Sequence, residues 1–148
     1  MKRKFAAVLA VLCVCIVGLS ACAPDVTINT PQGNFGVVEA TIEEEYDGQA
    51  APSGSRFLVV TLKPGTDNLN DIQAAFYSVG DAGFEEQTEV SVGGETVPLN
   101  NVSYLADEGV GTTNIFVRLF FIVPDSWDGQ KNVTFSGEGI SSVVLPIG

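Results

Sequence analysis

The sequence predicts an all-β domain, an immunoglobulin-like β-sandwich of about seven to nine short antiparallel strands. Short segments of alternating or continuous apolar residues recur at regular spacing along most of the chain. Sixteen glycines punctuate the sequence, many of them between these segments, where tight turns are expected. Beyond the N-terminal apolar run, no segment has a convincing helical period. A small closed barrel is the alternative architecture for this pattern.

The first segment, residues 1–21, has the three parts of an export signal. Three basic residues follow Met1, and residues 5–19 form an uncharged apolar run. The motif Leu19-Ser20-Ala21-Cys22 comes next, and it resembles the lipobox of bacterial lipoprotein signal peptides. That resemblance implies cleavage before Cys22 and attachment of a diacylglyceryl group to its thiol.

Lipidation would anchor the protein outside the cytoplasm, on the cell membrane or, in a diderm bacterium, on the outer membrane. Each buried CH₂ of an acyl chain such as palmitate contributes about 0.8 kcal/mol, so two or three chains hold durably. An uncleaved transmembrane helix over residues 5–23 is one alternative, because that stretch is just long enough to span. Gly18 within this stretch and Pro24 immediately after it argue against a transmembrane helix. Simple secretion is the other alternative.

The rest of the chain is expected to divide into a lipidated N-terminus and linker, residues 22–36, and one sandwich domain, residues 37–148. Cys13 and Cys15 lie in the leader and Cys22 is the lipidation site. The mature domain then has no thiol for a disulfide, a zinc site or a nucleophile.

The strand pattern begins with one short candidate in the linker, residues 26–28, and a half-buried strand over 37–45. Residues 56–63 carry apolar side chains at both odd and even positions, which predicts a central strand covered on both faces. Leu58, Val60 and Leu62 are expected to point into the core. Residues 72–79 fit either a strand or one helical turn. Their aromatic centre favours a strand.

The second half of the domain carries the clearer signals. Gly93-Gly94 predicts a two-residue hairpin between strands over residues 87–92 and 95–97, the latter at a sheet edge because Pro98 ends it. Residues 114–123 form the strongest strand. Three shorter strands are expected at 102–105, 133–135 and 143–145.

Two of these segments carry a family resemblance. Residues 54–62 (GSRFLVVTL) and 120–125 (FFIVPD) resemble the small immunoglobulin-like domains of bacterial lipoproteins and secreted antigens that include the DUF4352 and MPT63-like group. The resemblance covers roughly residues 37–145. It implies a two-sheet sandwich at the cell surface and carries no established activity.

The charge of the chain restricts its partners. All eighteen acidic residues follow Cys22, and the formal net charge is −11. Without the three basic residues of the leader, four basic residues remain against the eighteen acids, a net charge of −14. Nucleic acid is excluded as a partner, because phosphate neutralisation needs Lys and Arg. A cation or a basic partner is permitted, but solubility accounts for the excess of acids equally well.

Catalytic signals are missing from the sequence. The chain has no histidine, which removes Ser-His-Asp triads, most zinc sites and the usual proton shuttle. It also has no P-loop, dinucleotide fingerprint or nucleophile elbow. We therefore expect a protein that is not an enzyme and that has no cofactor or metal. A hydrolase using paired carboxylates is a remote alternative.

Two acidic clusters are candidates for cation sites. Glu43-Glu44-Glu45 alternates across a strand, so its carboxylates do not converge. Residues 67–71 (DNLND) form an acidic turn that offers oxygen ligands for Ca²⁺ but lacks the spacing of an EF-hand. A solvated turn is the favoured interpretation.

Three aromatic residues are candidates for binding a partner. Trp127 lies in a turn, where it can either anchor a partner or cap the core. The same two roles are open to Tyr46 and Tyr104. Arg118, in the strongest strand, is expected to pair with an acid or to lie at the sheet surface.

The leading functional hypothesis is a lipid-anchored, non-enzymatic module that binds a protein or polymer of the cell envelope. Loops at one end of the sandwich are the expected binding region. The alternative is an accessory or structural subunit of an envelope complex, which docks by a strand edge or a sheet face.

Overall fold

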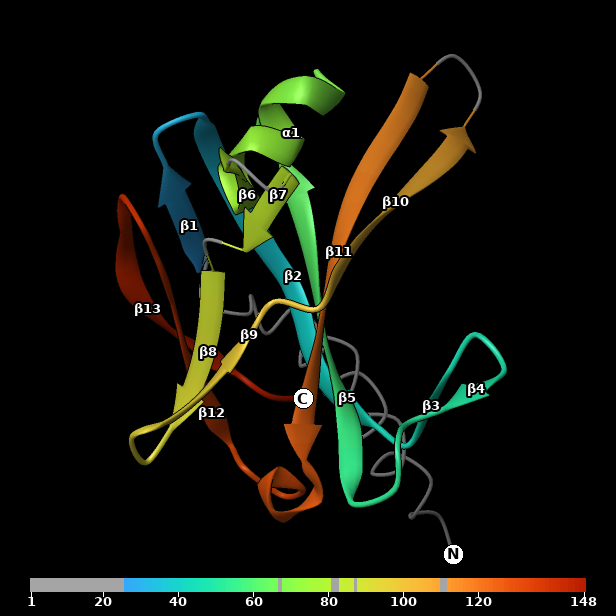
Figure 1. The fold of residues 1–148 in the computed structure, drawn as a ribbon. Helices are drawn as coiled ribbons and strands as arrows, with labels where there is room; N and C mark the ends of the chain where they lie inside the picture. Colours follow the sequence, from blue (N-terminus) through green and yellow to red (C-terminus); the bar gives the residue numbers. More distant parts are fainter. Residues whose placement is uncertain (1–25, 67, 81–82, 87, 110–111) are drawn as a thin grey trace, which may run out of the picture.

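The computed structural model of the protein describes residues 26–66, 68–80, 83–86, 88–109 and 112–148. Two antiparallel sheets pack against each other, and most of the described residues are in strands (Figure 1). The predicted all-β sandwich is confirmed. The leader and Cys22 lie outside the described residues, so lipidation remains a prediction.

The larger sheet has five strands in the order β1-β2-β5-β11-β10. Its central strand, β5, pairs with β2 on one side and with β11 on the other. The long β10–β11 hairpin forms one edge, and β1 forms the other. The strand bounds are Thr27–Thr30 (β1), Gly33–Glu43 (β2), Ser55–Pro64 (β5), Asn101–Gly109 (β10) and Thr112–Pro124 (β11).

The smaller sheet has four strands in the order β13-β12-β8-β9. The predicted hairpin at Gly93-Gly94 is confirmed: Val92 pairs with Glu95, and both glycines have positive φ (59° and 87°), as a type I′ turn requires. The strand ending at Pro98 lies at the sheet edge, as predicted. The bounds are Thr88–Val92 (β8), Glu95–Pro98 (β9), Asn132–Gly137 (β12) and Ile140–Pro146 (β13).

Four smaller features complete the described fold: two short hairpins, one α-helix and one 3-10 turn. The hairpin β3–β4 projects from the end of β2, and β6–β7 follows the helix (Figure 1). Their bounds are Glu45–Tyr46 (β3), Gln49–Ala50 (β4), Leu69–Phe76 (α1), Tyr77–Gly80 (β6), Gly83–Glu86 (β7) and Asp125–Trp127 (η1).

The core lies between the two sheets and is built by the period-2 alternation of their strands. On β5 the predicted inward residues are fully buried, and so is the matching face of β11. Phe121 of β11 meets Phe135 of β12 edge-on, with ring centroids 6.3 Å apart, which ties one sheet to the other. The fully buried core residues of the two central strands are Leu58, Val60, Leu62, Val117, Leu119, Phe121 and Val123.

The second face of β5 is also covered, as its sequence predicts. Val59 and Thr61 point away from the core, yet both are buried. Phe120, opposite Val59 on β11, is buried beside them. Part of the outer face of the large sheet is therefore covered as well.

The predicted strand over residues 72–79 is wrong for its first part, because α1 occupies Leu69–Phe76 and only the remainder is strand β6. Ile72, Ala75 and Phe76 follow helical spacing and all three are buried. The Phe76 ring packs at a tilt against the Phe35 ring, with centroids 4.8 Å apart, so packing against β2 holds the helix. Tertiary contact therefore overrides the strand preference of the aromatic residues.

The sheet begins earlier in the chain than the predicted domain boundary at residue 37. β1 pairs with the start of β2, inside the segment 22–36 that the sequence assigned to a linker. Ile28 and Phe35 are fully buried there. The short strand expected at residues 26–28 corresponds to β1, and β2 begins at Gly33, ahead of the strand predicted over residues 37–45.

Candidate functional site

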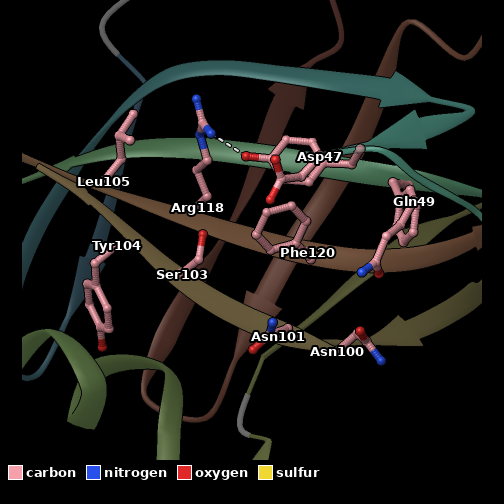
Figure 2. A pocket seen from close by; sticks show the side chains of 11 residues that line it. Asp47, Gln49, Asn100, Asn101, Ser103, Tyr104, Leu105, Arg118 and Phe120 are labelled. Carbon is pink, nitrogen blue, oxygen red and sulfur yellow. Dashed lines mark hydrogen bonds between the residues drawn. The ribbon is translucent and has the colours of Figure 1, made fainter. Parts of the chain in front are cut away.

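A pocket of about 530 Å³ lies on the outer face of the large sheet, away from the inter-sheet core. The hairpin β3–β4 forms one wall, β10 forms the opposite wall, and β11 supplies the floor (Figure 2). Aromatic and carboxamide side chains dominate the lining. The lining residues are Tyr46, Asp47, Gln49, Phe57, Asn100, Asn101, Ser103, Tyr104, Leu105, Arg118 and Phe120.

The β3–β4 wall depends on a tight turn at Asp47-Gly48. Tyr46 pairs with Gln49, and the two residues between them have φ of 51° and 75°. Asp tolerates this left-handed conformation and Gly adopts it without strain. An Asp-Gly pair is a strong hairpin signal. The pair Asp47-Gly48 is therefore the local sequence signal that could have located this hairpin.

The hairpin places Tyr46 against two residues of the floor. The Tyr46 ring meets Phe120 edge-on, with centroids 4.7 Å apart. Arg118 donates a hydrogen bond from Nη1 to the Tyr46 hydroxyl, and its Cζ lies 5.6 Å from the centroid of that ring (Figure 2). Of the two positions expected for Arg118, the one at the sheet surface is found, and its hydrogen-bond partner is a tyrosine rather than an acid.

Polar side chains of β10 form the opposite wall. Asn101 lies opposite Phe120 in the strand register, and Ser103 lies opposite Arg118, so both share the face that carries the floor. Just before the strand, the backbone N–H of Asn100 donates to the carbonyl of Phe120 at 2.8 Å, which fixes this wall to the floor. Gln49 reaches the site from the other wall, and its side chain is exposed.

Tyr104 lines the pocket, but its side chain points away from the side chains of Arg118, Ser103 and Phe120 (Figure 2). This follows from strand alternation, because Tyr104 lies between Ser103 and Leu105. Its side chain is 42% exposed. Partial burial disfavours the phenolate and raises the pKa of the Tyr104 hydroxyl above its ordinary value.

Trp127, the third candidate for binding a partner, belongs to the core. Its side chain is only 2% exposed and is part of the main apolar cluster. Its Nε1–H donates to the Glu95 carboxylate across 3.3 Å, which satisfies the polar edge of the ring. Of the two roles that the sequence left open, capping the end of the core is the one that the structure supports.

The acidic clusters are engaged in local interactions. Glu44 forms an ion pair with Arg56 at 3.1 Å, and Glu43 accepts a hydrogen bond from Thr41 at 2.7 Å. In the acidic turn, Asn68 accepts a hydrogen bond from the backbone N–H of Asn70 and so caps α1. Asp67 lies outside the described residues. Within the described ranges, no three acidic or other metal-ligating side chains gather to hold a metal ion.

The floor and walls of the pocket come from segments far apart in the chain. Sequence analysis named Tyr46 and Tyr104 as candidates and noted Arg118, and the structure brings all three to one region. Gln49, Asn100, Asn101 and Phe120 were not predicted, because only the β3–β4 hairpin and the register of β10 on β11 bring them together.

A comparison with protein-family models, curated proteins and solved structures found no match to this chain. Among the helices that the structure describes, none has the length and apolar character needed to cross a bilayer.

Proposed function

We propose that this protein is a lipid-anchored, extracytoplasmic binding module that acts without catalysis and takes its ligand in the pocket between β3–β4 and β10. The observation that carries the proposal is the contact of Tyr46, on the β3–β4 wall, with Arg118 and Phe120 on the pocket floor. Concave sites with an apolar base and a few convergent polar groups are the usual form of ligand sites.

The floor of the pocket is held in place before any ligand arrives. The Tyr46 hydroxyl accepts from Arg118, and the edge-on contact with Phe120 fixes the tilt of the Tyr46 ring. Side chains that are already ordered lose little conformational entropy on binding, so more of the contact energy contributes to affinity. Preorganisation of this kind supports a binding role over a purely structural one.

The cellular location in this proposal depends on the leader. The basic start, the apolar run and Leu19-Ser20-Ala21-Cys22 support export and acylation of Cys22. The partner would then be a protein or polymer of the cell envelope. Nucleic acid does not fit a domain in which acids outnumber basic residues so strongly.

Site-specific photocrosslinking in cells tests the binding role. A photoreactive residue at Gln49, on the rim of the pocket, should give a discrete adduct in the full-length protein. The same probe at Ser141, an exposed residue of β13, is the matched control and should not give that adduct. Tyr46→Ala should abolish the Gln49 adduct. Identical adducts at both positions would show that the pocket has no dedicated ligand.

An accessory subunit of an envelope complex is the second candidate. It is favoured by β10, which lies at the edge of the five-stranded sheet and exposes Tyr104 and Leu105. Such an edge can dock an additional strand. Stoichiometric co-purification with one membrane complex, unaffected by Tyr46→Ala, would favour this role over ligand binding.

A further inference from the structure

We propose that the ligand of the outer-face pocket is an uncharged, hydroxyl-rich saccharide, a segment of a neutral glycan. This inference rests on the proposed function, because it assumes that the pocket between β3–β4 and β10 is the binding site. Three properties of the lining carry it: charge balance, a set of carboxamide groups, and an aromatic floor with fixed geometry.

The charges of the pocket balance. Among its described lining residues, Asp47 supplies the negative charge and Arg118 the positive charge. The whole chain has a formal net charge of −11, so its long-range field repels acidic polymers. A cationic ligand would meet Arg118 at the floor. A neutral ligand is neither repelled by the acidic domain nor opposed by the positive charge of Arg118.

The polar groups of the walls suit hydroxyl groups. Gln49, Asn100 and Asn101 each present a carboxamide, which both donates and accepts hydrogen bonds, and Ser103 presents a hydroxyl that does the same. A sugar hydroxyl also donates and accepts, so each wall group can pair with one in either direction. The Asn101 Oδ1 accepts from the N–H of Val102, which orients the amide and leaves its NH₂ as a donor.

The aromatic floor suits the apolar face of a sugar ring. Tyr46 is half-buried against Phe120, and Phe57 lines the same floor. Aromatic rings with one polar edge combine apolar contact area with a hydrogen-bonding group. Arg118 uses one of its five N–H donors on Tyr46, so further donors remain for ring or hydroxyl oxygens.

A peptide fits the lining less well. Peptide grooves recognise side chains through apolar sockets or pair their backbone with a sheet edge. Here Leu105 is the one aliphatic side chain among the described lining residues, and it is exposed at the rim. The walls otherwise present amides and hydroxyls.

The inference is tested with purified full-length protein by NMR, using three neutral probes: the tetramer of N-acetylglucosamine, cellotetraose and maltotetraose. At least one should bind and shift the side-chain amide signals of Gln49 and Asn101. Tyr46→Ala and Asn101→Ala should each weaken binding about tenfold or more. Asn132→Ala, which removes an exposed amide from β12, is the matched control and should change affinity less than about twofold.

Two comparison probes separate the failure of this inference from the failure of the proposed function. These are tetragalacturonate, which is acidic, and a phage-displayed library of dodecapeptides. If tetragalacturonate or a peptide occupies the pocket and none of the neutral probes does, the inference of a neutral saccharide ligand is wrong while the binding role stands. If no probe of any kind shifts the Gln49 and Asn101 amide signals, the saccharide inference and the proposed binding role are both wrong. The same holds if Asn132→Ala weakens binding as much as Asn101→Ala. Each variant is first required to keep the amide signal dispersion of the wild type.

Discussion

Trp127 shows how little the position of a single residue in the sequence reveals about the direction of its side chain. It lies between polar residues in a turn, which is equally typical of an exposed anchor and of a core cap. Its burial and the hydrogen bond to Glu95 decide for the cap. Tyr46 differs because its hairpin carries it over the outer face of the sheet, where it contacts Arg118.

At this scale we predict that Trp127→Ala lowers the free energy of unfolding by about 3–5 kcal/mol, because it removes a large buried ring and leaves a cavity. Urea denaturation followed by circular dichroism measures the loss. The control is Val144→Ala, whose side chain is 57% exposed and whose removal should cost about 0.5 kcal/mol or less. Equal losses in the two variants would contradict the assigned role of Trp127.

At the scale of the element, α1 is the clearest departure from the sequence-based prediction. Its buried residues Ile72, Ala75 and Phe76 have helical spacing, but eight residues are too few for periodicity to outweigh the aromatic and β-branched residues that follow. The cap at Asn68 sets where the helix begins, and the tilted packing of Phe76 against Phe35 stabilises the helix from outside. Packing of that kind cannot be inferred from local sequence.

Asn68→Ala should lower the free energy of unfolding by about 1 kcal/mol, because the N–H of Asn70 loses its acceptor at the helix start. Asn68→Asp keeps an acceptor oxygen and should retain most of the stability. Chemical denaturation of the three proteins, together with hydrogen exchange of the amides of α1, provides the measurement. An Asn68→Asp variant as unstable as Asn68→Ala would show that the side chain does not act as a cap.

The strands could be predicted from the sequence much better than the pocket. Period-2 alternation located β2, continuous apolar runs located β5 and β11, and Gly93-Gly94 located the hairpin β8–β9, since each of these signals is local. The pocket requires Tyr46 to lie near Asn101 and Arg118, residues that come together only when β10 and β11 pair in one register. A one-residue slip of that register would turn Asn101 and Ser103 to the other face. Local patterns do not specify this pairing.

At the scale of the whole molecule, the leading prediction concerns attachment to the membrane. Cys22→Ala should move the protein from the membrane fraction to the soluble fraction, because the acylated thiol is the proposed anchor. Cys15→Ala changes a thiol in the apolar leader and should leave the protein in the membrane fraction. Immunoblotting of the two fractions makes the measurement.

Mass spectrometry of the purified protein provides an independent check of the same prediction. Cleavage before Cys22 and an acyl-modified N-terminal cysteine are expected. An unmodified thiol at that position with the leader still attached would contradict the anchor. Continued membrane association of Cys22→Ala would contradict it as well.

The pairing of β5 with β11 has a consequence for how the protein reaches its destination. Leu62 lies opposite Val117, so about 55 residues must be synthesised and arranged before the centre of the large sheet can close. Sheets dominated by such distant pairings fold in milliseconds to seconds rather than microseconds. A nascent chain that stays open for that long suits the proposed export, in which an unfolded chain would thread through a translocation channel.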